Sequence, residues 1–320
     1  MKLFNIHTLS KISITINQFF GTNRLYHFFN AIMIKLGVYR ILVNVFLKFG
    51  GTPIVTANMR DNTKLLIDLR SNTEYLAFFS GEYDSDLIEI LNNLLEPDDY
   101  FLDIGANIGF YSISIAAKIR AKGQGKVIAF EPFEGNFNRL KDNLNLNNLE
   151  DYCLLNKIGL SNENLDSLIT LREDFKSGSN TGNASISINK KIDSRFEKVS
   201  IKLEKLDDFW KKFVGEPRKI SLIKMDIEGH EDFCLEGGSK IIKEHRPTIL
   251  MEVNKPYYKA RGVVSLDELF LPRVPERYSI YWFDNNKWIQ IFTINKCKEI
   301  DNVFLIPNEK IQLNNYKIFN

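Results

Sequence analysis

The segment Asp103-Ile104-Gly105-Ala106-Asn107-Ile108-Gly109 constrains the fold of this chain more than any other. The apolar burst Tyr100-Phe101-Leu102 precedes it, and residues 110–117 have the small and apolar rhythm of a helix packed on a sheet. Glycine at positions 105 and 109 lets the backbone turn tightly and approach a ligand closely, because neither residue carries a Cβ. The segment therefore predicts a buried strand that passes through a glycine turn into a helix.

A second apolar run, Val127–Phe130, ends in the carboxylate of Glu131. In doubly wound sheets a carboxylate at this place can accept hydrogen bonds from both hydroxyls of a ribose, so the combination predicts a nucleoside-binding half-sheet. A dinucleotide fingerprint would read G-x-G-x-x-G, whereas this chain reads D-x-G-x-N-x-G. The anionic Asp103 suits a ligand with cationic groups, such as S-adenosylmethionine, which has an ammonium, a sulfonium and no phosphate.

Composition indicates an ordinary globular chain. The 320 residues are 44% hydrophobic and carry a net charge of +2, which predicts one main domain with an appendage and no nucleic-acid partner. Three distant cysteines are typical of small buried hydrophobes in a reducing compartment. No Cys/His metal spacing and no signal peptide are recognisable, so we expect a cytoplasmic protein without a bound metal.

Residues 1–50 are expected to form a basic amphipathic helical extension, because residues 1–60 contain seven basic side chains and no acidic one. The apolar stretch 28–49 could span a bilayer as a helix of about 33 Å. Lys35 and Arg40 would then lie near the membrane centre at about 2.5–3.5 kcal/mol each, which argues against a span. Two interpretations remain open, a helical cap on the catalytic domain or a peripheral helix on the inner face of the membrane.

Gly50-Gly51 marks the end of this extension. Residues 51–95 are predicted to form a hairpin, with strands at 54–56 and 65–67, and a helix at 87–95 that leads into a main domain over 96–310. That domain should contain a helix at 231–243 and further strands at 152–155, 220–225, 248–253, 278–283, 288–292 and 303–306. The polar stretch 161–200 is interpreted as an inserted β-flap near the substrate, with a disordered surface loop as the alternative.

The strand predicted at 220–225 carries a charged block at its carboxyl end. Alternation along an extended strand places Lys224, Asp226 and Glu228 on one side. A buried lysine needs a partner, for which Asp226, Glu228 and Glu252 are the candidates. Ligands of open α/β sheets lie beyond the carboxyl ends of the strands, so Asp103, Glu131, Asp226 and Glu252 should surround one cleft.

These motifs carry a resemblance to a known family. Asp103–Gly109, Ala129–Pro132, Leu206–Phe209 and Ile223–Glu231, which contains Lys-x-Asp-x-Glu-Gly-x-Glu, resemble FkbM-type S-adenosylmethionine-dependent methyltransferases over roughly residues 75–255. The resemblance implies an α/β fold with a Rossmann-like, seven-stranded, mostly parallel sheet covered by helices on both faces. It also implies S-adenosylmethionine as the cofactor, bound by Asp103, Gly105, Ala106, Asn107, Gly109, Phe110, Glu131, Pro132 and Asn156.

The resemblance further implies methyl transfer to a hydroxyl of a saccharide, glycan or natural-product intermediate. General-base assistance is worth about 10²–10⁴-fold, and Asp226 and Glu228 are the favoured bases. His230 is a weaker candidate, since it begins a helix, and Lys224 and Glu252 complete the catalytic set. A divalent cation held by Asp226, Glu228 and Glu252 is the less favoured alternative. N- or carboxyl-methylation, or a non-catalytic nucleoside-binding subunit, are the rival functions.

Overall fold

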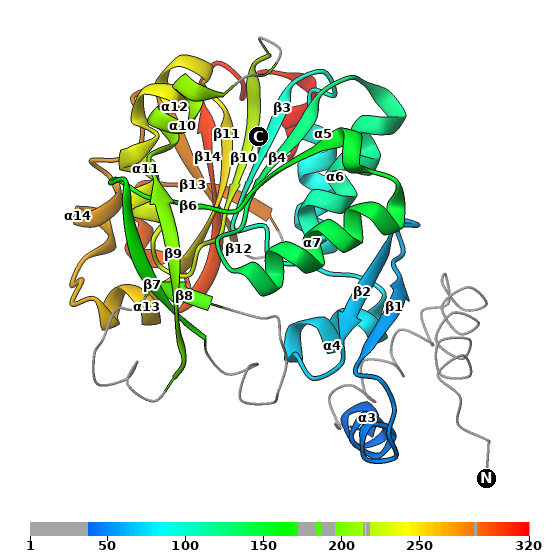
Figure 1. Ribbon diagram of the computed structural model, residues 1–320. Helices are drawn as coiled ribbons and strands as arrows, with labels where there is room; N and C mark the ends of the chain where they lie inside the picture. Colours follow the sequence, from blue (N-terminus) through cyan, green and yellow to red (C-terminus); the bar gives the residue numbers. More distant parts are fainter. Residues whose placement is uncertain are drawn as a thin grey trace.

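A large central sheet organises the molecule (Figure 1). The computed structural model describes residues 38–171, 184–186, 196–213, 215, 218–284 and 287–319. Eight strands form the central sheet in the order β13-β12-β14-β11-β10-β3-β4-β5. Their bounds are Tyr100–Ile104 (β3), Lys126–Phe130 (β4), Cys153–Asn156 (β5), Ile220–Met225 (β10), Thr248–Asn254 (β11), Tyr278–Asp284 (β12), Lys287–Ile291 (β13) and Ile300–Pro307 (β14).

The sheet is mostly parallel, as predicted. Strands β11, β10, β3, β4 and β5 pair parallel to one another, whereas β14 pairs antiparallel with both β11 and β12. The predicted number of seven strands is wrong, because β13 joins the edge of the sheet as the antiparallel partner of β12. Because these strands are parallel, the carboxyl ends of β3, β4, β10 and β11 lie on the same side of the sheet, where the loops that follow them meet.

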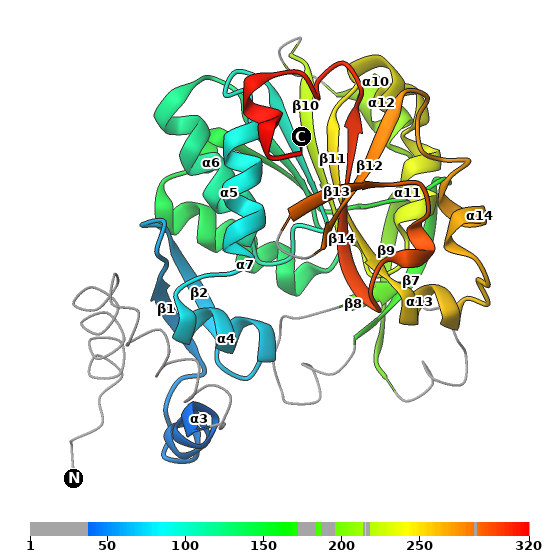
Figure 2. The same ribbon diagram turned by 180° about the vertical axis from the view of Figure 1, so that it is seen from behind.

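Helices cover both faces of the sheet (Figure 2). Neighbouring strand residues alternate between two hydrophobic cores, with Phe101 in one and Leu102 in the other. The first core contains residues of α5 (Ser85–Leu94), α6 (Phe110–Lys122), α7 (Glu134–Asn147) and η3 (Asn314–Phe319). The second contains residues of α10 (Leu206–Lys212), α11 (Glu231–Gly237), α12 (Ser239–His245), α13 (Lys255–Ala260) and α14 (Leu266–Phe270). Like η3, the short elements η1 (Glu150–Tyr152) and η2 (Ile294–Lys296) are 3₁₀ helices.

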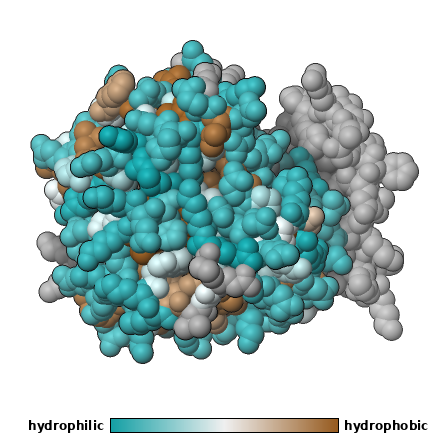
Figure 3. Space-filling model, turned by 90° about the horizontal axis from the view of Figure 1, so that it is seen from above, coloured by the Kyte–Doolittle hydropathy of each residue, from teal (hydrophilic) through white to brown (hydrophobic). Residues whose placement is uncertain are grey.

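The segment predicted as one helix over 231–243 is two helices, so that prediction is wrong. The helix α11 ends at Gly237 and α12 begins at Ser239. A Cβ on Gly237 would lie 1.9 Å from the carbonyl oxygen of Ser161, and one on Gly238 would lie 2.9 Å from Leu206 Cδ2. The two glycines at the break therefore let the backbone of Ser161 and the side chain of Leu206 in α10 pack closely against it. The face that carries α10 and α12 at the top of Figure 1 is mostly hydrophilic with scattered apolar residues (Figure 3).

The N-terminal part consists of α3 (Val38–Lys48), the predicted hairpin of β1 (Ile54–Asn58) and β2 (Lys64–Asp68), and α4 (Asn72–Ser80). Residues 28–37 of the expected long helix lie outside the described part of the chain, and α4 was not predicted. Val43 of α3 is buried, and the Arg40 guanidinium lies 4.0 Å from the centre of the Tyr75 ring. Among the described residues, no helix combines the length and the apolar character that a membrane span requires.

The predicted insertion forms a second small sheet. It has the order β6-β9-β7-β8, from β6 (Gly159–Leu160), β9 (Lys198–Glu204), β7 (Leu165–Leu171) and β8 (Ala184–Ile186). Pairing of Ile169 with Ile186 matches the expected hairpin, whereas β9 was not predicted. The described part is thus a flap rather than a loop, and the expected tip at 176–183 lies outside it. We call these four strands the flap sheet.

Candidate active site

The glycine turn between β3 and α6 is fixed on the neighbouring strand. Gly105 and Asn107 both have positive φ angles, of 79° and 51°. The backbone N–H groups of Gly105 and Ala106 both donate to the carbonyl oxygen of Phe130, each at 3.0 Å. The turn is therefore held at the carboxyl end of β4, beside the acid that follows that strand.

The same turn also touches the end of β10. A Cβ on Gly105 would lie 2.0 Å from the backbone carbonyl oxygen of Asp226. Real Cβ atoms essentially never come within 3.0 Å of another heavy atom, and a backbone oxygen cannot move aside as the end of a side chain can. Glycine is required here because two loops that carry functional motifs are in direct contact.

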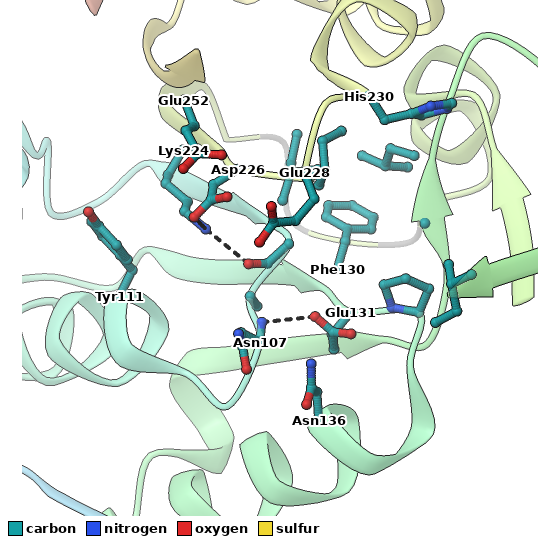
Figure 4. Close-up of a pocket in the computed structure, with 18 of the residues that line it drawn as sticks. Asn107, Tyr111, Phe130, Glu131, Asn136, Lys224, Asp226, Glu228, His230 and Glu252 are labelled. Atoms are coloured by element: carbon teal, nitrogen blue, oxygen red, sulfur yellow. Dashed lines mark hydrogen bonds and ion pairs between the residues drawn. The ribbon is translucent and has the colours of Figure 1, made fainter. Parts of the chain in front are cut away.

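Glu131 holds the turn from the other side. Its Oε2 accepts a hydrogen bond from the backbone N–H of Asn107 at 2.9 Å, and its Oε1 accepts one from Phe133 N–H at 3.0 Å. Burial raises the pKa of Glu131 to about 7, although these two bonds, Lys224 and Asn136 partly offset the effect. Figure 4 shows its carboxylate at the floor of a pocket, between Asn107 and Asn136. It lies where the sequence places a ribose-binding acid.

One pocket brings most of the predicted site residues together. It lies at the carboxyl ends of β3, β4, β10 and β11, where ligands of open α/β sheets bind. The predicted cofactor residues on its wall are Gly105, Ala106, Asn107, Phe110, Glu131 and Pro132, and the predicted catalytic residues are Lys224, Asp226, Glu228, His230 and Glu252. The two motif regions, more than 90 residues apart in sequence, therefore face the same space.

Three predicted cofactor residues do not line this pocket. The Asp103 side chain is fully buried, where its Oδ2 accepts a hydrogen bond from Ser112 Oγ at 2.6 Å. The Asn156 amide donates to the backbone carbonyl of Ala129 at 3.2 Å. Gly109, with a φ of 102°, precedes α6, and a Cβ on it would lie 2.6 Å from Leu140 Cδ1. The prediction of direct ligand contacts is corrected for these residues, which shape the pocket from behind.

Lys224 is buried and paired, as its position in the strand requires. Its ammonium donates to the carbonyl oxygen of Gly105 at 2.9 Å and lies 3.5 Å from Asp226 Oδ2 and 3.6 Å from Asp103 Oδ1. Burial would lower the pKa of Lys224, but the carboxylates of Asp226, Asp103 and Glu252 outweigh it and raise the pKa. Asp226 was a predicted partner, whereas Asp103 was not. Lys224 is therefore a fixed cation that joins β10 to the glycine turn.

The loop after β10 departs from the extended geometry assumed for it. The strand ends at Met225, and Glu228 and Gly229 have positive φ angles of 57° and 87°. The strict alternation predicted through Glu228 is wrong for this reason. Asp226 and Glu228 nevertheless both reach the pocket, because the loop turns back over the strand ends (Figure 4).

Three residues that were not predicted as site residues lock this loop. Glu231 Oε1 accepts hydrogen bonds from the N–H groups of Ile227 at 2.9 Å and Gly229 at 3.3 Å, and its other oxygen accepts one from the Tyr258 hydroxyl. Arg261 donates to the Gly229 carbonyl at 2.6 Å. Glu231 belongs to the charged block itself and could have been found there, but nothing local indicates Tyr258 or Arg261.

Arg261 also neutralises a buried acid. Its two guanidinium nitrogens donate to the carboxylate oxygens of Asp232 at 2.6 and 2.8 Å, and the side chain of Asp232 is only 1% exposed. Bidentate pairs of this kind fix orientation as well as charge. The segment after β11 therefore determines the shape of the loop after β10.

Glu252 has an unusual environment for a carboxyl group. Among the described residues its Oε2 is buried without a hydrogen-bond partner. Burial, followed by the charges of Asp226, Glu228 and Glu231, raises the pKa of Glu252 well above its ordinary value. The raised pKa favours the protonated form of Glu252, which makes this residue a weaker candidate for the base than Asp226 or Glu228.

His230 lies between the flap sheet and the loop after β10. Its Nε2 lies 2.9 Å from Ser161 Oγ, at the end of β6 in the flap sheet. Burial lowers the pKa of His230 to about 4, with Asp232 opposing and Arg261 reinforcing the shift. This histidine links the flap sheet to the loop after β10, which favours a positioning role over that of a base.

The flap sheet supplies an apolar wall that was not predicted. Ile169, Ile201 and Leu203 line the pocket together with Phe130 and Pro132. Thr73, Tyr83 and Tyr111, from the N-terminal part and α6, line its other end. Within the ranges that the structure describes, no three His, Cys, Asp or Glu side chains are grouped so that they could hold a metal ion.

The strand order, the glycine turn and the acid after the second parallel strand define the Rossmann-like sheet of class I methyltransferases. A sequence model described as the methyltransferase FkbM domain matches residues 103–298, which is more than half of the chain. The chain belongs to the FkbM methyltransferase family. No curated protein matches it significantly.

Several solved structures are similar to it. The FkbM methyltransferase of Methylobacillus flagellatus KT is 19% identical, with a TM-score of 0.39 over 67% of this chain and 45% of that one. TYW2 of P. horikoshii, solved with MeSAdo, is 14% identical, with a TM-score of 0.41 over 80% and 71%. The Pyrococcus abyssi tRNA (uracil-54, C5)-methyltransferase, in complex with S-adenosyl-L-homocysteine, is 12% identical, with a TM-score of 0.38 over 80% and 44%. The chain thus spans under half of the M. flagellatus protein.

Proposed function

We propose that this protein transfers a methyl group from S-adenosylmethionine to a hydroxyl of a saccharide, glycan or related natural-product intermediate. The observation that carries the proposal is the single pocket in which the glycine turn and Glu131 face the carboxylates of Asp226 and Glu228. The family and the fold support methyl transfer, and the acceptor class is the finer part of the proposal.

The residues present fit this cofactor. Glu131 would hold the ribose, and the apolar wall of Phe130, Pro132 and the flap sheet would cover the adenine. The two carboxyl groups of Asp226 and Glu228, set against the one ammonium of Lys224, suit a ligand with an ammonium and a sulfonium. The cofactor supplies an electrophilic methyl group bound to a positively charged sulfur.

The side chains around Lys224 can manage the acceptor proton. The acceptor hydroxyl would take the methyl group as the cofactor's sulfur releases it, and the hydroxyl proton would pass to Asp226 or Glu228. Lys224 holds Asp226 in place at 3.5 Å, which restricts the approach geometry. The raised pKa of Glu252 favours its protonated form, which would donate a hydrogen bond to the acceptor.

Two measurements test this function. Calorimetric titration with S-adenosylmethionine, S-adenosylhomocysteine and NADH tests the cofactor, and tighter binding of NADH would contradict the proposal. Transfer of a labelled methyl group to sugar nucleotides, glycans and lipid-linked saccharides tests the acceptor, and mass spectrometry then identifies the methylated atom. Methylation on nitrogen or on a carboxyl group would replace O-methylation while leaving the cofactor assignment intact.

We also propose that the protein works in the cytoplasm with α3 against an anionic membrane surface. Ile41 and Val45 of this helix, and Phe49 directly after it, follow a four-residue spacing and are 61%, 47% and 78% exposed. Vesicles containing anionic lipid should float with the wild-type protein and less with Ile41→Ser/Phe49→Ser. Val264→Ser, at a residue 99% exposed elsewhere, is the matched control. Equal flotation of all three proteins would contradict membrane contact.

A further inference from the structure

A second cavity adjoins the active-site pocket. It has a volume of about 430 Å³ and lies between the tip of the β1–β2 hairpin, α5 and α6. Two residues, Tyr83 and Phe110, line both spaces. Their rings are stacked with centroids 4.1 Å apart and planes 16° apart, and this pair is the common border of the pocket and the cavity.

The cavity extends away from the pocket along one helix. Phe110, Ser114 and Lys118 of α6 line it at four-residue intervals, which places them on one face of the helix. Eight residues of helix rise about 12 Å, which is enough for more than one sugar ring beyond the reacting group. The cavity is therefore an elongated groove that runs along α6 from the ring pair that it shares with the active-site pocket.

Many hydrogen-bonding side chains line the groove, and they include acidic, basic and uncharged groups. Asn92 and Glu89 of α5 face it, and the Nδ2 of Asn92 donates to Ser114 Oγ at 3.5 Å. Among the described residues the Oδ1 of Asn92 is buried without a partner. Arg60 of the hairpin and Glu82 pair at 2.8 Å at the rim, with both side chains about one third exposed.

These features exclude some ligand classes and favour another. The lining carries the acids Asp61, Glu82 and Glu89 against Arg60 and Lys118, so a polyphosphate or a nucleic acid would meet no excess of positive charge. A purely apolar chain would bury charged and amide groups without partners. A chain of hydroxyl groups matches them, because each hydroxyl both donates and accepts hydrogen bonds.

We infer that this groove is an acceptor subsite, which holds the second sugar unit of an elongated saccharide whose first unit is methylated in the pocket. The inference rests on the proposed function and deepens it, since it assigns the length of the acceptor as well as its class. The Tyr83–Phe110 pair, which borders both spaces, would lie beside the linkage that joins the two units.

The test compares acceptors of different length on the full-length protein. We compare kcat/KM for labelled-methyl transfer to a disaccharide with kcat/KM for transfer to a monosaccharide glycoside that contains the same reacting unit. The ratio of the first value to the second should be at least ten. Asn92→Leu and Lys118→Ala should each reduce this ratio at least threefold, mainly through KM of the disaccharide. Lys141→Ala, on an exposed face of α7, should leave the ratio unchanged. Thermal unfolding checks that each variant is folded.

The outcomes separate the subsite from the function. If S-adenosylhomocysteine fails to bind the wild-type protein in calorimetry, the proposed function itself is refuted. If it binds but the ratio is near one in the wild-type protein, or is unaltered in both groove variants, only the subsite is refuted. If no mono- or disaccharide is methylated, and none binds the S-adenosylhomocysteine complex, the saccharide class is refuted with it.

Discussion

The contact between the glycine turn and the loop after β10 makes a sharp prediction for Gly105→Ala. The added Cβ would lie 2.0 Å from the Asp226 carbonyl oxygen and 2.9 Å from Ile227 Cγ2, at a φ of +79°. Gly50→Ala is the matched control, because Gly50 has a φ of +82° with no atom within 4 Å of its added Cβ. Both variants incur the left-handed backbone penalty of about 1–2 kcal/mol, and only one incurs the clash.

The clash has an expected magnitude. Relief requires the backbone of one loop to move by about 1 Å, and overpacking of this kind typically costs about 1–3 kcal/mol. Gly105→Ala should therefore unfold with a free energy about 1–3 kcal/mol lower than Gly50→Ala in urea. Its Tm should be lower by roughly 2–4 °C for each kcal/mol, as for a domain of this size. Its affinity for S-adenosylhomocysteine should fall as well, because the displaced loops line the pocket.

The control decides how the result is interpreted. If Gly105→Ala and Gly50→Ala have the same unfolding free energy and the same affinity for S-adenosylhomocysteine, the two loops are not in obligatory contact. The account of the site given above would then fail at its first step.

Three further predictions concern the charged groups. Asp226→Asn should lower kcat about 10²–10⁴-fold with little change in S-adenosylhomocysteine affinity, and full turnover would exclude Asp226 as the base. Glu252 has a raised pKa, so the folded state binds more protons than the unfolded state. The free energy of unfolding should therefore fall as the pH rises above 4.5, the ordinary pKa of a glutamate. Glu252→Gln should abolish that part of the loss in urea unfolding at pH 5, 7 and 9, and parallel curves for the two proteins would contradict the shift. Arg261→Ala leaves Asp232 buried and unpaired and should cost about 3–5 kcal/mol in urea unfolding, whereas a loss below 1 kcal/mol would show that the pair is not needed to hold the loop.

The sequence predicted the elements that depend on local pattern. The strand β3, the turn after it and the acid Glu131 follow from apolar runs and glycine positions, and the structure has them where they were expected. The β1–β2 hairpin follows from alternating residues around a polar turn in the same way.

The sequence predictions that were wrong concern features that depend on contacts between distant segments. Asp103 appeared to be a ligand-binding acid because it ends the strand motif, but Ser112 and Lys224 hold its side chain inside the protein. The break in the helix at Gly238 depends on the packing of α10 and the flap sheet, which no local signal reveals. The groove along α6 likewise exists only because the N-terminal hairpin lies beside α5.

The last strand of the sheet has a consequence for synthesis on the ribosome. Strand β14 lies between β11 and β12 and pairs with both, although residues 300–307 follow both in the chain. Until these residues leave the exit tunnel, two strand edges remain open, and open edges invite association with other chains. A nascent chain halted before residue 300 should therefore be prone to aggregation and need a chaperone, even though every residue of the pocket has already been made.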